Sequence, residues 1–508
     1  MNIIKSTGTF SFYTLISRIS GYLRDILIAI FLGSGPIADA FFVAFRIPNT
    51  FRRLFAEGTF NAAFVPSYTS ENIKGKNYSQ KFADEVFNLL LISLLFIVLL
   101  AEIFTPFLVY LIAPGFFSNS EKFNLAIELT RITFPFLLFV SISSFFAGIL
   151  NSNNKFAAAA AAPIILNLIL ILALFVAYFF GLNYTKVLSY GVFFSGVIQL
   201  LFLVYFSRKY YFPRVKLRYN FTYKVKSFLK KLLPSIFSSG VTQINILIGT
   251  IIASFQSGAV SYLYYADRVY QINLAIAGIA VGTVSLPTLA KNIKLKNIKS
   301  INLIQNRSIE LSFLFSIPAT FGLLIASDQI INSLFGYGSF SSLDVKNTAL
   351  ALTFFSIGVP AFSLIKVLST FYFARGNTKL PFYVSFLTMI INIAISISFF
   401  KKYGFIIIPI ATSISTWVAV LIYFILLLRK KIISFEDKYL INFLKILVAT
   451  IFMSLFLYFG LDIFEDKFEY TYKFKLIYLL IVIGLSATIY LIIIKLLGVL
   501  SLKNYKLK

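Results

Sequence analysis

Apolar runs long enough to cross a lipid bilayer recur along the whole chain of 508 residues. A membrane-spanning helix needs about 20 consecutive, mostly apolar residues. Because the bilayer core satisfies no backbone hydrogen bond, such runs must be helical. The sequence therefore predicts an all-α, polytopic membrane protein. Hydropathy places about fourteen spans, near residues 7–32, 37–60, 86–112, 127–150, 157–181, 187–207, 235–255, 262–287, 308–332, 347–373, 381–400, 405–428, 440–461 and 476–497.

The composition agrees with a membrane protein and excludes several kinds of site. The chain is 59% hydrophobic and 13% charged, whereas soluble domains are about 25% charged. It contains no cysteine and no histidine, which excludes disulfides, thiolate metal sites and imidazole bases. The first span begins almost at the N-terminus and is followed by no small-residue cleavage site, so we expect an uncleaved helix.

The net charge of +27 is distributed unevenly. Lysine and arginine gather in the segments 208–231, 291–307 and 429–445, whereas 462–475 carries several acids. Because cytoplasmic loops attract basic residues, this pattern predicts that both termini are cytoplasmic. No stacking platform accompanies the basic loops, so a nucleic-acid partner is not expected.

Two motifs suggest that the chain repeats itself at an offset of about 220 residues. "VAFRIP" (43–48) matches "YADRVY" (265–270), and 153–167 resembles 376–392. Parallel repeats are typical of secondary transporters, whose substrate site lies between the repeats. The predicted organisation is an N-lobe (1–207), a basic cytoplasmic linker (208–234), a C-lobe (235–428), a second basic linker (429–439), and two extra helices with a cytoplasmic tail (440–508).

Charged residues inside the spans are the candidate functional residues. A charge at bilayer depth costs at least a few kcal/mol and usually faces a bundle interior or a watery cavity. An internal salt-bridge network is the structural alternative, favoured where Arg53 and Glu57 lie four residues apart. We also expect Pro48 to break or kink the second span. The polar set in spans one, two and eight is Ser17, Arg18, Arg24, Asp25, Asp39, Arg46, Arg52, Arg53, Glu57, Asp267 and Arg268.

The arginines in this set outnumber the acids. A guanidinium matches phosphate oxygens with two parallel hydrogen bonds and does not lose its charge by deprotonation. A cavity with such a surplus suits an anion, so the sequence predicts a phosphate or diphosphate ligand.

The segment "SRISGYLRDILIAIFLGSGPIADAFFVAFRIPNTFRRLFAEGTFNAAFVP" (17–66) resembles the N-terminal signature of the MurJ (MviN) family of lipid II flippases. This family belongs to the multidrug/oligosaccharidyl-lipid/polysaccharide (MOP) exporter superfamily. Further matches are 131–151, 264–287 and 371–381. The resemblance implies fourteen helices, with two six-helix lobes around a central cavity and a groove for the lipid tail formed with the last two helices. It also implies that undecaprenyl-diphosphate-linked peptidoglycan precursor is flipped across the bacterial inner membrane by alternating access.

The resemblance also assigns roles to individual residues. Arg24, Arg52 and Arg268 match the family's diphosphate-binding arginines, and Arg18 and Arg53 would assist them. The remaining polar residues of the cavity and its gates would be Ser17, Asp25, Asp39, Glu57, Asp267 and Gln271. The implied partners are lipid II, membrane lipids and the cell-wall synthesis machinery.

Two departures from the family pattern concern Gln271 and ion coupling. Some relatives have a glutamate where this chain has Gln271, and some bind sodium with carboxylates on helices seven and eleven. Spans 235–255 and 381–400 contain no acid, so strict sodium dependence is not expected. Neutral oxygens of Asn392, Ser396 and Thr412 are the candidates for a weak cation site. The membrane potential is the expected driving force, and no phosphate-binding GxxxxGK[ST] loop points to ATP or another cofactor.

Two rival functions remain open. Another exporter of the same superfamily, for lipid-linked oligosaccharides or drugs, would share the spans and the repeat. A membrane-embedded glycosyltransferase would need a carboxylate base or a metal pair near the headgroups. The only acid clusters, "FEDK" (435–438) and "FEDKFE" (464–469), are interpreted as solvated loop charges. An enzyme is therefore not expected.

Overall fold

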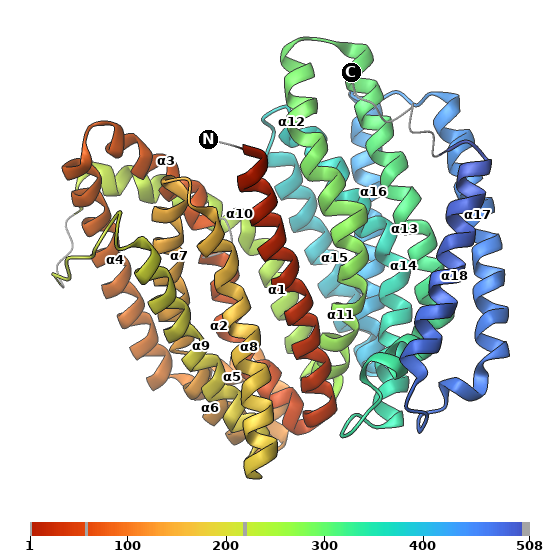
Figure 1. Cartoon of the computed structure of the whole chain (residues 1–508), viewed down its shortest axis with the longest axis horizontal. Coiled ribbons are helices and arrows are strands. Elements are labelled where there is room, and N and C mark those ends of the chain that lie inside the picture. Colours follow the sequence, from red (N-terminus) through yellow and green to blue (C-terminus); the bar gives the residue numbers. More distant parts are fainter. Residues whose placement is uncertain (1–2, 56–58, 217–220, 500–508) are drawn as a thin grey trace. The chain divides into compact units, whose positions relative to one another are not determined.

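The structure is a computed structural model that describes residues 3–55, 59–216 and 221–499. The side chains of 3–8, 10, 51, 53–55, 59, 62, 233–239 and 241–242 also lie outside this description. Throughout the described ranges the regular structure is helical, with no strand (Figure 1). The predicted all-α fold class is confirmed.

Contacts between residues divide the chain into two compact units, Met1–Ser261 and Tyr262–Lys508. The boundary falls inside α11 (Ala259–Leu274). The other helices of the first unit are α1 (Ile3–Leu32), α2 (Pro36–Phe55), α3 (Thr59–Ile73), α4 (Lys76–Ile103), α5 (Thr105–Ile112), η1 (Pro114–Ser118), α6 (Ser120–Thr133), α7 (Phe136–Ser152), α8 (Phe156–Phe180), α9 (Tyr184–Ser207) and α10 (Tyr223–Ala253). Those of the second are the π-helical turn η2 (Ala275–Ala280), α12 (Val281–Lys294), α13 (Ile298–Phe335), α14 (Ser342–Phe373), α15 (Lys379–Tyr403), η3 (Gly404–Ile406), α16 (Ile407–Arg429), α17 (Asp437–Ile463), η4 (Glu465–Phe468) and α18 (Lys475–Leu496).

Every predicted span lies mainly on helix, although turns at Phe104 and at Phe134 and Pro135 interrupt the third and fourth spans. Among the described residues, 10 helical stretches are long and apolar enough to cross a membrane. The chain is therefore a multi-pass membrane protein, while the count of about fourteen spans stays a prediction. Pro48 does not end α2, which continues to Phe55.

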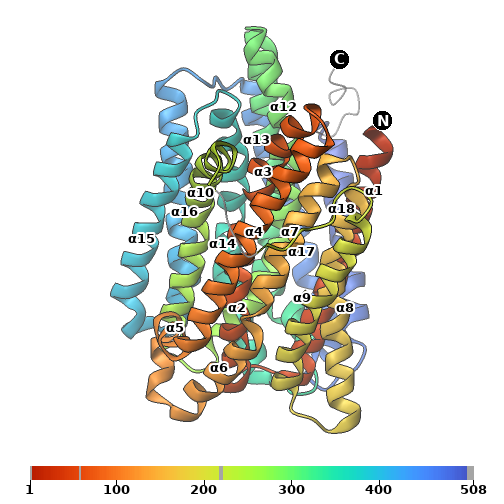
Figure 2. The ribbon, with the colours of Figure 1, turned by 90° about the vertical axis from the view of Figure 1, so that its left-hand side faces the viewer.

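Aromatic rings form the core of the first unit, where α3, α4 and α7 pack side by side (Figure 2). The ring of Phe64 lies 5.1 Å from that of Phe60 and 5.1 Å from that of Phe145, measured between centroids. Gly148 of α7 makes this approach feasible, because a Cβ there would lie 2.7 Å from the Phe64 ring. Phe228, near the start of α10, packs on the same rings.

In the second unit, α17 and α18 pack against α13 (Figure 1). Ile446 and Tyr490 contact Leu314 and Ile317 in one buried cluster. The last two helices thus share apolar packing with this unit. The contact-based division places α10 with α2 and α3, whereas the repeat places 235–255 in the C-lobe. The repeat reflects sequence similarity rather than packing, so the predicted domain limits stay a prediction.

Candidate functional site

Arg24 and Asp25 form a buried ion pair on α1. Their exposed fractions are 5% and 2%. Arg24 donates from Nη2 to Asp25 Oδ1 at 2.6 Å and from Nε to the same oxygen at 3.0 Å. Its Nη1 donates to Asn167 Oδ1 of α8 at 2.9 Å. Because the Asp25 charge balances the guanidinium, an anionic ligand here would have to compete with that carboxylate or extend the network.

The residues before Arg24 allow α1 and α8 to approach closely. A Cβ on Gly21 would lie 3.3 Å from the side-chain nitrogen of Asn167. The same Asn167 nitrogen donates to the Ser17 carbonyl at 2.9 Å and to Ser20 Oγ at 3.1 Å. Arg18 is exposed on the helix surface. Of the polar residues predicted in the first span, Ser17 and Arg24 therefore lie against α8, and Arg18 lies outside this contact.

Asp39 of α2 is fully buried and accepts four hydrogen bonds. Lys122 of α6 donates from Nζ at 2.7 Å, and the Gly258 backbone N–H donates at 2.8 Å. Ser261 donates from its backbone N–H at 2.9 Å and from Oγ at 2.6 Å. A buried carboxylate is tolerated when it is paired and hydrogen-bonded in this way. Asp39 therefore links α2 and α6 to Gly258 and Ser261, at the start of α11.

The remaining charges of α2 are described only in part. The Arg46 guanidinium donates to Thr250 Oγ1 of α10, and Arg52 Nε donates to Asn49 Oδ1 at 2.8 Å. The Arg53 side chain and all of Glu57 lie outside the described residues. The predicted pairing of Arg53 with Glu57 therefore stays a prediction.

In the second unit, Arg268 lies against an aromatic ring one turn earlier on α11. Its Nη2 donates to Tyr264 Oη at 3.0 Å, and its Cζ lies 4.8 Å from the centre of that ring. Asp267 accepts a hydrogen bond from Gln271 Nε2. Gln271 thus provides a neutral partner for this acid.

One charged residue inside a predicted span, a lysine of the second unit, is not among the predicted site residues. Lys366 lies inside the apolar α14 and has an exposed side chain. Beside it, a Cβ on Gly282 would lie 3.2 Å from the Lys366 carbonyl oxygen, so α12 passes close to α14 here. The signal was a lone charge in a long apolar run, which is typical of functional positions in membranes.

The three candidates for a weak cation site lie together between α15 and α16. Asn392 Nδ2 donates to Thr412 Oγ1 at 3.3 Å, and Ser396 Oγ donates to Asn392 Oδ1 at 3.1 Å. Thr412 Oγ1 also donates to the Ile408 carbonyl at 2.7 Å. A cation would have to replace these mutual hydrogen bonds. Within the part of the chain that the structure describes, no cluster of three or more acidic side chains suits a metal ion.

Comparisons with known proteins identify the family. Residues 28–480 match the family model described as lipid II flippase MurJ. A probable lipid II flippase MurJ from Rhizobium tropici is 42% identical over 436 residues, covering 85% of this chain and 82% of that protein. The corresponding protein of Rickettsia prowazekii is 39% identical over 422 residues, covering 82% of each.

Solved structures agree with this assignment. The chain is 30% identical to lipid II flippase MurJ in an inward closed conformation, with a TM-score of 0.81, and the match covers 96% of this chain and 98% of that one. An inward-facing multidrug resistance MATE family transporter of the MOP superfamily shares the fold at 15% identity and a TM-score of 0.67, over 80% of this chain and 93% of that one. The predicted resemblance is confirmed, and the chain belongs to the lipid II flippase MurJ family.

Proposed function

We propose that the chain flips lipid II, the undecaprenyl-diphosphate-linked peptidoglycan precursor, from the cytoplasmic to the outer leaflet of the bacterial inner membrane. The observation that carries this proposal is the family match, which extends from residue 28 to residue 480. The proposed function is thus the transport of a precursor that cell-wall synthesis requires. Both termini lie in the cytoplasm under this proposal, because the basic loops must remain there.

The arginines supply the chemistry that recognises a diphosphate. Arg24, Arg52 and Arg268 each carry a forked donor that matches phosphate oxygens. Arg52 and Arg268 are partly exposed, and each donates one hydrogen bond to a neutral side chain, Asn49 and Tyr264.

Alternating access requires contacts that form in one state and break in another. The hydrogen bonds of Asp39 suit this role, because they join α2 and α6 to Gly258 and Ser261 just where α11 begins. Breaking them would leave a buried carboxylate without its donors, which is costly. We propose that opening this contact exposes Asp39 to water and so lowers that cost.

The test is flipping of fluorescent lipid II by the purified full-length chain in liposomes, together with rescue of a bacterium depleted of its own lipid II flippase. We expect transport of lipid II and rescue of growth. Transport of other lipid-linked oligosaccharides or of drugs, with no transport of lipid II, would instead support another exporter of the superfamily. The shared fold with a MATE transporter makes this the relevant alternative.

A further inference from the structure

A pocket of about 420 Å³ lies within the second unit, between α13, the end of α16 and the start of α17. Its volume falls in the range of small-molecule sites, about 300–1,000 Å³. None of the residues proposed for diphosphate binding contributes to it. Its lining includes Asn306, Glu310, Phe424, Phe435, Glu436 and Phe443.

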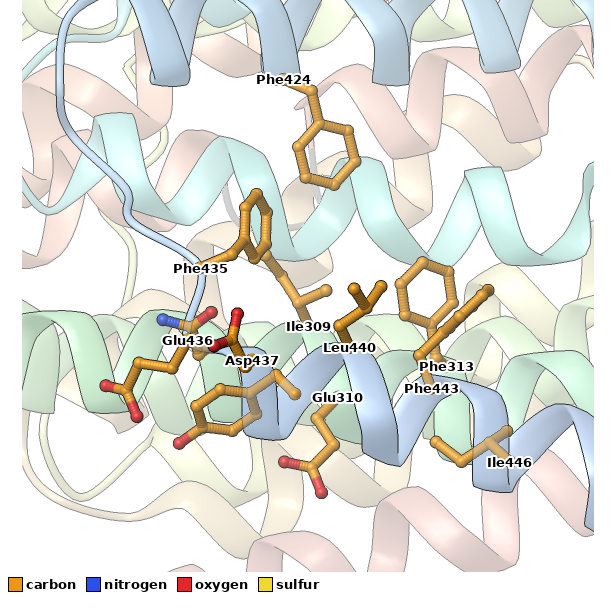
Figure 3. A pocket seen from close by; sticks show the side chains of 12 residues that line it. Ile309, Glu310, Phe313, Phe424, Phe435, Glu436, Asp437, Leu440, Phe443 and Ile446 are labelled. Atoms are coloured by element: carbon orange, nitrogen blue, oxygen red, sulfur yellow. The ribbon is translucent and has the colours of Figure 1, made fainter.

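The pocket combines aromatic rings with carboxylates. In Figure 3 the rings of Phe424, Phe435 and Phe443 lie around the apolar part, and the carboxyl groups of Glu310 and Glu436 lie toward one side. Asp437 adds a third acid. Aromatic faces and carboxylates both attract cations, and three acids disfavour a diphosphate.

Two residues that line the pocket each have a buried side-chain oxygen with no hydrogen-bond donor among the described residues. Glu310 is 4% exposed, and one carboxylate oxygen accepts from Asn442 Nδ2 at 3.0 Å. Its other oxygen has no hydrogen-bond partner among the described residues. Asn306 donates to the carbonyls of Asn302 and Ser434, yet its own side-chain oxygen is also without a donor in the described structure.

Nearby basic residues do not supply the missing hydrogen bond to Glu310. Arg307 and Lys438 interact electrostatically with Glu310, but neither donates a hydrogen bond to its second oxygen. A buried acceptor without a donor costs about 1–3 kcal/mol. A ligand with several N–H donors would satisfy both oxygens, and an ammonium carries three such donors.

The rim of the pocket indicates that the ligand comes from the lipid phase. Phe435 and Leu440 are exposed by 48% and 63%, and Leu444 one turn further along α17 by 55%. α17 is one of the helices apolar enough to span a membrane. An apolar rim on a membrane-spanning helix opens toward lipid rather than toward water.

We propose that this pocket binds the headgroup of an aminophospholipid. The ammonium donates to Glu310 and to the side-chain oxygen of Asn306, and it lies against the aromatic rings. The phosphate of the same zwitterionic headgroup is attracted by Lys438 and Arg307. The acyl chains lie along the exposed apolar face of α17 that carries Leu440 and Leu444.

The test uses the full chain in nanodiscs of phosphatidylglycerol, with and without phosphatidylethanolamine. Lipids retained after extraction are counted by native mass spectrometry, and the thermal midpoint of unfolding is recorded. We expect wild-type protein to retain phosphatidylethanolamine at least about tenfold over phosphatidylglycerol, as one charge-assisted hydrogen bond allows. Glu310→Gln should abolish this preference, while the matched control Asp466→Asn, an exposed acid of the same unit, should keep it.

Phe435→Ala is a second variant that tests the same pocket if Glu310→Gln does not fold. Phe435 is half-exposed, so its truncation should weaken retention of the lipid without unfolding the chain. Equal retention of both lipids by wild-type protein would overturn the proposal, as would an unchanged preference in a folded Glu310→Gln variant. Dodecylamine that binds at Glu310 without any preference for phosphatidylethanolamine would identify a soluble amine as the ligand and would also overturn it. Each result is independent of lipid II flipping.

Discussion

The Lys122 ammonium lies 2.7 Å from the Asp39 carboxylate, and both side chains are buried. Lys122 Nζ also lies 3.9 Å from the centre of the Phe116 ring. The two residues come from α2 and α6, so one ion pair joins helices that are distant in sequence. Because Asp39 also binds Gly258 and Ser261, the stability of three segments depends on this pair.

Lys122→Met should strongly destabilise the protein, because it leaves the Asp39 charge buried without its counter-ion. The expected loss is about 3–5 kcal/mol, measured as a fall in the thermal midpoint of the purified protein. The matched control is Lys186→Met, since Lys186 pairs with Glu128 on the surface and such a pair is worth about 0–1 kcal/mol. Similar losses in the two variants would contradict the structural importance of the buried pair.

The double variant Lys122→Met with Asp39→Asn should recover much of this stability. Removing both charges eliminates the unpaired buried ion, and a well-packed neutral pair is often as stable as the ion pair it replaces. The amide oxygen of an asparagine can still accept from the Ser261 N–H and Oγ, which bind Oδ1, whereas the Gly258 N–H, which binds Oδ2, loses its acceptor. If the double variant is as unstable as Lys122→Met, then Lys122 stabilises the protein by packing against Phe116 rather than by its charge.

Hydropathy predicted the positions of the helices but not their full lengths. The spans predicted from 86, 235 and 308 belong to helices that begin at Lys76, Tyr223 and Ile298. These first turns carry lysines and other polar residues, which a hydropathy window rejects. Helical hydrogen bonds continue into water, whereas the hydropathy signal stops at the edge of the hydrocarbon core.

The candidate charges were predictable from sequence, but their partners were not. Arg24 and Asp25 are adjacent in the chain, so their pairing needs no tertiary information. Asn167, 143 residues from Arg24, and Lys122, 83 residues from Asp39, meet their partners only through helix packing. No periodicity in a single sequence specifies which helices pack against each other.

Arg24→Lys should reduce lipid II flipping by at least about tenfold, which corresponds to about 1.4 kcal/mol. A lysine is a point charge that cannot bind Asp25 with two nitrogens while a third binds Asn167. The measurement is the initial flipping rate in liposomes at equal protein content. The control is Arg131→Lys, an exposed arginine in the last turn of α6, which should keep the rate. Full activity of Arg24→Lys would exclude a role for the guanidinium fork.

Glu71, on α3 and outside the candidate spans, should make stability depend on pH. Burial acts to raise the pKa of its carboxyl, but the hydrogen bonds and charges of Lys224 and Lys74 outweigh burial and hold the pKa below its usual value. Lys224 Nζ lies at 2.5 Å and Lys74 Nζ at 2.8 Å. Because the folded pKa is lowered, this stabilisation is present above the unfolded pKa of about 4.3 and is lost as the pH falls through the folded pKa.

Glu71→Gln should therefore be less stable than wild type at pH 7, and the difference should disappear as the pH falls from 7 through the folded pKa of Glu71. The side chains of Lys74 and Lys224 are 54% and 39% exposed. Solvent screening therefore limits the difference in stability between Glu71→Gln and wild type to about 1 kcal/mol. The measurement is the thermal midpoint of both proteins across this pH range. Glu128→Gln, which removes an exposed ion pair, serves as the control. A difference between Glu71→Gln and wild type that persists in acid would show that the amide alters packing rather than charge.

Transport should not depend strictly on sodium. Spans 235–255 and 381–400 contain no acid, and Na⁺ is a hard cation that favours oxygen ligands, ideally with an anionic one among them. The neutral oxygens of Asn392, Ser396 and Thr412 already bind one another, so a cation gains little by replacing these contacts. Each elementary charge that crosses a potential of 100 mV contributes about 2.3 kcal/mol. We therefore expect the potential acting on the cationic chain to drive the return of the empty transporter. Flipping rates in sodium and in choline buffers, at one imposed potential, should be equal for wild type and for Asn392→Ala. A rate that vanishes in choline and falls in Asn392→Ala would instead establish a sodium site at this position.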